Sequence, residues 1–194
     1  METGKYGKKL KEYTDMLFRD ALQSDFNKLG EIAAMLLDAK AGKKRIYIAG
    51  NGGSAATASH MANDLIKGCR VGKSTGLRAL ALTDPLPVIT CLANDFSYDD
   101  IFSIQLETQA DEGDLFVVYS GSGNSLNIVK AVETAKRIGL KTIAFTGGNG
   151  GKLKSLCDTV IIAPSPVMEQ IEDIHMFYEH ALVTLIREEL SVTA

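Results

Sequence analysis

The first forty residues carry apolar side chains at helical spacing and show no strand-like alternation. Within residues 4–40 these side chains form two groups, one on each side of Ser24: Leu10, Tyr13 and Leu17, then Leu29, Ile32 and Leu36. Residues three or four apart fall on one face of an α-helix, so the spacing predicts amphipathic helices. We therefore expect one or two helices here, interrupted near Ser24.

From Lys43 onward the pattern changes to short apolar runs, rich in β-branched residues, that alternate with helical stretches. The five runs are residues 45–50, 77–83, 114–120, 141–147 and 159–165. Their nearly continuous apolar character indicates strands that are covered on both faces, as in a parallel sheet. Helical spacing is found over residues 54–67, 100–109, 125–138 and 167–189. Ser165 and Pro166 are expected to begin the last helix, as its N-cap and first turn.

Alternating strands and helices predict an α/β fold, a doubly wound sandwich with a five-stranded parallel sheet. The 194 residues, 45% of them hydrophobic, are enough for one well-buried domain. We therefore predict a single domain over residues 1–194. It would comprise an N-terminal helical segment (1–42) and an α/β core (43–194).

Net charge and cysteine content indicate which kinds of partner and which cellular compartment to expect. A formal net charge of −3 provides no general attraction to nucleic acid or to an anionic membrane. No window approaches the ~20 apolar residues that span a bilayer. The three cysteines are widely spaced and include no CxxC pair, which indicates reduced thiols. We therefore expect a soluble, cytoplasmic protein with neither nucleic acid nor membrane as a partner.

Two turns rich in glycine and serine each lie between a predicted strand and a predicted helix. They are residues 50–54 (GNGGS) and residues 120–125 (SGSGNS). Parallel α/β sheets bind ligands at the carboxyl ends of their strands, where glycine backbone amides and serine hydroxyls can bind an anion. The first turn is neither a GxGxxG dinucleotide motif nor a Walker A loop. A phosphate ester of a small metabolite therefore fits better than a nucleotide. The third glycine cluster, residues 147–151, is interpreted as a structural turn.

Histidines and carboxylates are spaced so that two predicted helices would each present them on one face. His60 and Asp64 lie four residues apart after the first turn. On the last helix, Glu172 lies three residues before His175 and eight before His180. Two imidazoles and two carboxylates can bind zinc or a similar divalent ion, or can act without metal as general acid and base. The spacing does not choose between these roles, nor between His175 and His180.

Five motifs in order resemble one family over nearly the whole chain. They are residues 50–60 (GNGGSAATASH), 92–106 (LANDFSYDDIFSIQL), 120–125 (SGSGNS), 146–153 (TGGNGGKL) and 171–180 (IEDIHMFYEH). Together they resemble the sedoheptulose 7-phosphate isomerases, also called phosphoheptose isomerases, of the SIS (sugar isomerase) superfamily. The resemblance implies a flavodoxin-like SIS fold of three layers and a homotetramer with active sites between subunits. It also implies isomerisation of sedoheptulose 7-phosphate to a glycero-manno-heptose 7-phosphate.

The resemblance further implies roles for individual residues. The implied contacts to the sugar phosphate are Asn51, Gly52, Gly53, Ser54, Asn94, Asp95, Ser120, Gly121, Ser122, Ser125 and Glu172. The implied ligands of a divalent metal, zinc by its donor set, are His60, Asp64, Glu172 and His180, which favours His180 over His175. By the same resemblance, Asp64 is the base at carbon, His180 is the acid at oxygen, and the metal is the Lewis acid.

Two of the implied ligands depart from the family pattern. Asp64 stands where the family has glutamate, and Glu172 stands where it has glutamine. Aspartate is one methylene shorter than glutamate, and Glu172 adds a negative charge, although both side chains can still coordinate a metal. Gly121 stands where threonine is usual. These changes affect which metal is bound, which group acts as the base and which sugar phosphate is the substrate.

Three alternatives to this function follow from the same superfamily. One is a non-catalytic SIS protein that binds a replication initiator, and another is an isomerase of a different phosphosugar. A third is a sugar-phosphate sensor, but SIS regulators of transcription usually carry a separate DNA-binding domain, for which 194 residues leave no room. All four ligand positions hold groups that coordinate metal or transfer protons. We therefore favour the phosphoheptose isomerase.

Overall fold

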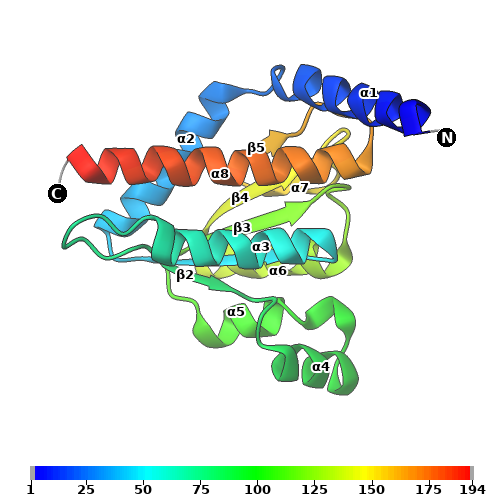
Figure 1. The fold of residues 1–194 in the computed structure, drawn as a ribbon. Coiled ribbons are helices and arrows are strands. Elements are labelled where there is room, and N and C mark those ends of the chain that lie inside the picture. Colours follow the sequence, from blue (N-terminus) through cyan, green and yellow to red (C-terminus); the bar gives the residue numbers. More distant parts are fainter. Residues whose placement is uncertain (1–2, 193–194) are drawn as a thin grey trace.

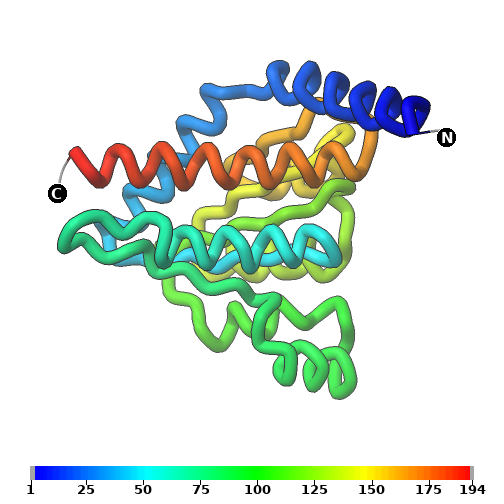
Figure 2. Tube along the Cα trace, viewed as in Figure 1, coloured from blue at the N-terminus to red at the C-terminus, as the bar shows by residue number. Residues whose placement is uncertain are grey.

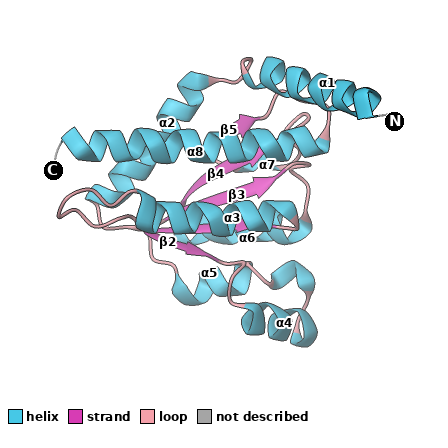
Figure 3. Ribbon diagram, in the orientation of Figure 1, coloured by secondary structure: helices cyan, strands magenta, loops and turns pink. Residues whose placement is uncertain are grey.

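A computed structural model describes residues 3–192 as an α/β sandwich, with one sheet between two layers of helices (Figures 1 and 3). Within that range the five strands are all parallel and lie in the order β2-β1-β3-β4-β5. This is the flavodoxin-like strand order, whose ligand site lies where the chain changes direction between β1 and β3. The predicted fold class is confirmed.

Each strand lies inside one of the predicted runs. The strands are β1 (Arg45–Gly50), β2 (Arg78–Ala81), β3 (Leu115–Ser120), β4 (Lys141–Thr146) and β5 (Thr159–Ile162). The central strand β3 is buried along its whole length, whereas the edge strand β2 alternates between exposed and covered residues. The two edge strands, β2 and β5, are shorter than the runs predicted for them.

The N-terminal segment forms two helices, α1 (Thr3–Ala21) and α2 (Phe26–Ala41). Ser24 lies in the turn between them, as predicted. The Asp25 carboxylate ends this turn by accepting a hydrogen bond of 2.9 Å from the Lys28 backbone N–H, which caps α2. Helix α2 then buries one face against the sheet: Leu29, Ile32, Ala33, Leu36 and Ala39.

Three helices cover one face of the sheet: α2, α3 (Gly53–Asn63) and α8 (Met168–Val192). Figure 1 shows α3 and α8 side by side. In Figure 2 both helices run in the same direction, from the side labelled N to the side labelled C. Helix α8 begins at Met168, so Ser165 and Pro166, predicted as its N-cap and first turn, lie just before it, where Ser165 Oγ accepts a hydrogen bond of 3.4 Å from Val167 N–H. None of the described helices combines the length and the apolarity needed to cross a membrane.

The opposite face carries α4 (Leu86–Asp95), α5 (Ser103–Gln109), α6 (Leu126–Ile138), α7 (Leu153–Leu156) and a 3-10 turn, η2 (Tyr98–Asp100). The predicted helix 100–109 is therefore split between η2 and α5. Helices α4 and α7 are not predicted, because α4 contains Pro87 after Pro85, and α7 is a single short turn.

The predicted helix 54–67 changes its geometry where the site begins. Regular α3 ends at Asn63, and residues Asp64–Gly68 form one π-helical turn, η1. In this turn the Cys69 backbone N–H donates to the Asp64 carbonyl at 3.0 Å, an i to i+5 bond. Such turns recur at functional sites because they re-aim side chains. Asp64, predicted as a ligand and base, is the first residue of this one.

Candidate active site

The two predicted turns lie next to each other at the carboxyl edge of the sheet. Strands β1 and β3 pair in parallel, with Gly50 opposite Tyr119. The turns that follow them, residues 51–53 and 121–125, therefore emerge side by side at the switch point of the sheet. The structure thus brings together two segments that the sequence separates by about seventy residues.

A pocket of about 160 Å³ lies between these turns and the start of α8. It is lined by Asn51, Ser54, Tyr119, Ser120, Gly121, Ser122, Ser125, Met168 and Glu172. All four serines of the predicted phosphate site are among them. Because Ser54 belongs to the first turn of α3 and Ser125 immediately precedes α6, two helix N-termini open toward the pocket. Helix N-termini and hydroxyls are suited to binding a phosphate group.

The glycines of the first turn are required by backbone geometry and by close packing. Gly52 has φ of 57°, a conformation that side chains disfavour. A Cβ atom on Gly53 would lie 2.6 Å from Glu172 Oε2, so glycine allows the carboxylate of Glu172 to approach the start of α3. Gly121 makes similar room for Met168, whose Sδ would lie 2.5 Å from an added Cβ.

Asn51 is held by a residue that the sequence did not single out. The amide groups of Asn51 and Asn127 exchange two hydrogen bonds, both 2.9 Å long. Asn127 is 2% exposed, and its Oδ1 also accepts from the Ile128 backbone N–H at 2.9 Å. Tyr98 donates its hydroxyl to Asn51 Oδ1 at 3.0 Å. The only signal for Asn127 in the sequence was its place on the first turn after SGSGNS.

Asn94 and Asp95, which the resemblance places near the sugar, lie at the exposed end of α4. Asn94 Nδ2 donates to Asp95 Oδ1 at 2.7 Å, and Cys91 Sγ donates to the other carboxylate oxygen at 3.3 Å. These two hydrogen bonds lower the pKa of Asp95. Neither residue lines the serine pocket in the described chain. From the same motif, Tyr98 is the residue that reaches the first turn.

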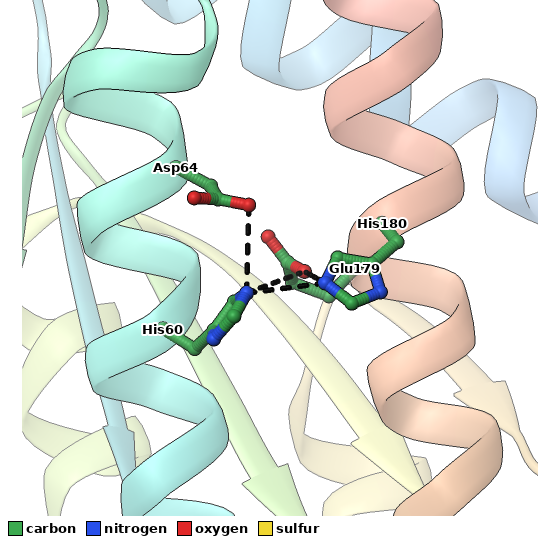
Figure 4. Close-up of side chains that lie close together, drawn as sticks. All are labelled: His60, Asp64, Glu179 and His180. Carbon is green, nitrogen blue, oxygen red and sulfur yellow. Dashed lines mark hydrogen bonds and ion pairs between the residues drawn. The ribbon is translucent and has the colours of Figure 1, made fainter.

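A second group of side chains lies farther along the same two helices (Figure 4). His60 Nε2 on α3 lies 3.1 Å from His180 Nε2 on α8 and 3.5 Å from Asp64 Oδ2. His60 and His180 are partly open to solvent, with side chains that are 42% and 55% exposed. Three of the four predicted ligands therefore converge: His60, Asp64 and His180.

The fourth member of this group is Glu179, which is not among the candidates that the sequence indicates. Its side chain is fully buried, and its Oε2 lies 3.5 Å from His180 Nε2 and 3.9 Å from His60 Nε2. Neither of its carboxylate oxygens has a hydrogen-bond partner within residues 3–192. Burial, and after it the negative charge of Asp64, raise the pKa of Glu179 to about 7. The pattern gave no sign of it because helical spacing assigns position 179 to the core.

The other two candidates on α8 lie elsewhere. Glu172 is not among the residues whose ligand atoms converge; it faces Gly53 and the serine pocket instead. His175 is 1% exposed, its Nε2 lies 3.1 Å from the Thr146 carbonyl oxygen, and its ring packs among Tyr119, Phe145 and Tyr178. Burial lowers the pKa of His175 to about 4. The structure thus separates His180, in the group, from His175, in the core.

The group has the chemistry and the spacing to hold a divalent cation. The ligand atoms of His60, Asp64, Glu179 and His180 all lie within 4.8 Å of one another. Donor atoms bound ~2.0–2.1 Å from one tetrahedral ion lie roughly 3.3 Å apart. Four of these separations, His60–His180 at 3.1 Å, His60–Asp64 and Glu179–His180 at 3.5 Å, and His60–Glu179 at 3.9 Å, lie close to that value. Two imidazoles and two carboxylates are also ligands that such ions accept.

Comparison with known proteins first shows the general class of protein to which the chain belongs. A family model described as a SIS domain matches residues 9–147. With the five-stranded parallel sheet and the serine turns at its switch point, this match defines a SIS-domain protein.

Individual relatives and solved structures narrow the class. The phosphoheptose isomerase of Aliarcobacter butzleri is 40% identical over 89% of each chain, and that of Aneurinibacillus thermoaerophilus is 37% identical over 82% of this chain and 80% of its own. The structure of the phosphoheptose isomerase from Francisella tularensis covers 97% of this chain and 100% of its own, with a TM-score of 0.89 and 26% identity. The chain belongs to the phosphoheptose isomerase family.

Proposed function

We propose that the protein is an aldose-ketose isomerase that interconverts sedoheptulose 7-phosphate and a glycero-manno-heptose 7-phosphate through an enediol. The observation that carries this proposal is that the serine pocket and the histidine group lie on the same two helices. Gly53 and His60 are seven residues apart on α3, roughly 10 Å along its axis at 1.5 Å per residue. That spacing suits a substrate whose phosphate and reacting carbons are at opposite ends of a short chain.

The serine pocket is proposed to bind the phosphate. Ser54, Ser120, Ser122 and Ser125 would supply hydroxyls, and the N-termini of α3 and α6 would supply backbone N–H groups. Asn51, fixed by Asn127, would donate to a sugar hydroxyl next to that pocket. Binding energy gained at the phosphate would orient the far end of the sugar for reaction.

His60, Asp64 and His180 are proposed to hold a divalent metal ion, zinc by its preference for imidazole and carboxylate. Bound there, the ion would supply Lewis-acid polarisation of the two oxygens between which the carbonyl moves. Asp64 has two carboxylate oxygens and His180 two ring nitrogens. In each residue one of these atoms faces the space between α3 and α8, and the other is left for proton transfer. A carboxylate bound tightly to the ion is a weaker base, so the two roles of Asp64 compete.

Asp64 and His180 are proposed to move the protons. In the ketose, the Asp64 carboxylate takes a proton from C1 while His180 gives a proton to O2, which forms the enediol. His180 then takes the proton from O1 while Asp64 returns its proton to C2, which forms the aldose. Each side chain ends in its starting protonation state, so the exchange of hydrogen between carbons needs no net acid or base.

An enzyme explains these features better than the alternatives do. A SIS protein that only binds a replication initiator has no need to bring His60, Asp64 and His180 together. The names of relatives at 40% identity also support an isomerase of a seven-carbon phosphosugar over an isomerase of another sugar.

The assembly is proposed to be a homotetramer in the cytoplasm, with active sites between subunits. Support comes from an apolar groove next to His180, lined in part by Leu17, Phe177, Ala181 and Leu185. Covering such a groove with a second copy would remove apolar surface from water beside the site. The three cysteines, none of them in a disulfide within the described chain, agree with a reducing compartment.

One assay tests the proposed reaction. Purified protein is incubated with sedoheptulose 7-phosphate, with and without a chelator, and aldose formation is followed. We expect product that disappears on chelation and returns with Zn²⁺. Absence of product with every divalent ion tried would rule out the isomerase, and product insensitive to the chelator would rule out the metal.

A further inference from the structure

Glu179 presents an unusual combination of burial and missing partners. It is 0% exposed, and neither carboxylate oxygen accepts a hydrogen bond within residues 3–192. A buried carboxylate without a partner is strongly unfavourable, because the interior cannot replace the water that it loses. Glutamate persists in such places when something compensates its charge. The side chains around Glu179 therefore indicate which kind of group compensates its negative charge.

The nearest polar neighbours of Glu179 are two imidazole nitrogens, atoms that can bind a metal ion, and neither forms a hydrogen bond with its carboxylate. Its Oε2 lies 3.5 Å from His180 Nε2 and 3.9 Å from His60 Nε2, and those two nitrogens lie 3.1 Å from each other. The separations between the carboxylate oxygen and the two nitrogens are too long for direct hydrogen bonds of ordinary length. In Figure 4 the four side chains point toward one shared space between α3 and α8. That arrangement suits an ion between them.

Glu172 is in a different position on the same helix. It lies seven residues before Glu179, which is roughly 10 Å along the axis of α8. Its carboxylate faces the start of α3, where Gly53 leaves room for it, and it lines the serine pocket. Helices α3 and α8 run in the same direction, so Glu172 is level with Gly53, while Glu179 is level with His60.

We propose that Glu179 is the fourth protein ligand of the divalent ion in this chain, and that Glu172 faces the substrate pocket as a free carboxylate. The inference rests on the metal site of the proposed function and assigns its missing ligand. Asp64 and Glu179 then offset the two positive charges of the ion, and the buried group is compensated. Glu172, which stands where the resembled family has glutamine, is not needed for coordination.

A matched pair of substitutions separates the two glutamates. Glu179→Gln and Glu172→Gln make the same isosteric change on the same helix, and each removes one negative charge. Metal-free protein is titrated with Zn²⁺ by calorimetry. We expect Glu179→Gln to weaken Zn²⁺ binding by tenfold or more, since even residues that only orient metal ligands contribute about 10–100-fold. Glu172→Gln is expected to stay within about twofold of the unchanged protein.

Thermal unfolding provides a readout that a purely structural role would not reproduce. In chelator, Glu179→Gln should unfold at the same or a higher temperature, because the substitution removes a buried charge without a partner. With Zn²⁺ present, the unchanged protein and Glu172→Gln should gain stability, and Glu179→Gln should gain clearly less. A residue that only supports packing would lower the melting temperature equally in both conditions.

The assignment is overturned if Glu172→Gln loses Zn²⁺ affinity as much as Glu179→Gln or more, or if the unchanged protein binds no divalent ion. Binding is measured without substrate, so the result does not depend on the isomerase. Inactive protein with Glu179-dependent Zn²⁺ binding would contradict the proposed reaction and keep the ligand. Active protein whose Zn²⁺ affinity is the same in Glu179→Gln as in the unchanged protein would contradict the ligand and keep the proposed reaction.

Discussion

The Nε2 atoms of His60 on α3 and His180 on α8 lie 3.1 Å apart, although 120 residues separate them in the chain. Their rings meet edge to face, with centroids 5.0 Å apart. Two nitrogens at this distance can share one proton or one cation. The packing of α3 against α8 over one face of the sheet therefore creates the reactive end of the site, whereas the turns after β1 and β3 create its phosphate end.

Asp64→Asn should abolish turnover and leave sugar-phosphate binding nearly unchanged. The amide keeps the size of the carboxylate but cannot accept a proton from carbon at neutral pH. Loss of a general base lowers kcat by about 10²–10⁴-fold. The serine pocket, which binds the phosphate, lies about two turns away or more along α3. Steady-state kinetics and direct measurement of substrate binding test both halves of the expectation.

Asp64→Glu is the matched control for this substitution. It restores the longer side chain that stands in the resembled family, keeps the charge, and is expected to retain activity. Measurable isomerase activity in Asp64→Asn, at a tenth of the unchanged rate or more, would remove Asp64 from the role of base.

Ser125→Ala should weaken phosphate binding without weakening the fold. Ser125 precedes α6 and lines the pocket, yet its side chain makes no capping hydrogen bond to that helix in the described structure. A hydrogen bond to a charged group contributes about 1.5–3 kcal/mol, so its loss should raise KM about tenfold or more. Inhibition by inorganic phosphate should weaken in parallel, with the melting temperature unchanged.

Ser191→Ala serves as the comparison for that variant. Ser191 lies near the C-terminal end of α8, is exposed, and donates its hydroxyl to the Glu188 carbonyl at 2.6 Å. Its replacement should leave KM unchanged. If Ser125→Ala bound phosphate as tightly as Ser191→Ala does, the hydroxyl of Ser125 would not contribute to phosphate binding.

The sheet and the phosphate turns could be predicted from the sequence because both are local patterns. Continuous apolar runs define buried strands, and a glycine–serine turn after such a run defines where it ends. The structure confirms the strands and brings Ser54, Ser120, Ser122 and Ser125 into one pocket. The regular helical pattern also placed His60 correctly on α3, whereas Asp64, predicted on the same helix, begins the π-helical turn η1.

What could not be predicted depends on contacts between distant segments. Glu179 occupies a position that helical spacing assigns to the core, and only the approach of α3 shows that its oxygens face two histidines. Asn127 likewise gains its role from a partner, Asn51, on another turn. The π-helical turn at Asp64 also produces no hydrophobic periodicity from which it could be predicted.

Gly121→Thr should destabilise the protein, and Met168→Ala should relieve the effect. Threonine is usual at this position in the resembled family, but here an added Cβ would lie 2.5 Å from Met168 Sδ and 3.6 Å from Ile171 Cγ2. Overpacking of this kind costs about 1–3 kcal/mol. Because Met168 is the closest obstacle and is 48% exposed, shortening it should recover most of the loss.

A double-mutant cycle in urea tests this coupling. The free energies of unfolding of both single variants and the double variant are compared at one protein concentration. A coupling of about 0.5–3 kcal/mol is expected for residues in contact. Additive effects would show that the turn accommodates threonine by moving its own backbone.

His175 should make the protein less stable as the pH falls from about 6.5 to about 4. Burial lowers the pKa of His175 to about 4, below its ordinary value of 6.5, so the unfolded chain binds the proton first. The stability that neutral His175 contributes is complete above pH 6.5 and is lost as the pH falls toward 4. Between pH 7 and pH 5 the loss from this one residue is about 2 kcal/mol.

The measurement is a difference between the unchanged protein and His175→Gln, because other groups titrate in the same range. Glu179, whose folded pKa is raised to about 7, contributes a slope of opposite sign, with stability lost as the pH rises. That slope is present in both proteins and cancels in the difference. Glutamine can still donate to the Thr146 carbonyl oxygen, which His175 contacts at 3.1 Å. Urea unfolding at pH 7 and pH 5 should show a smaller decrease for His175→Gln; equal decreases would mean that His175 takes up its proton in the folded protein.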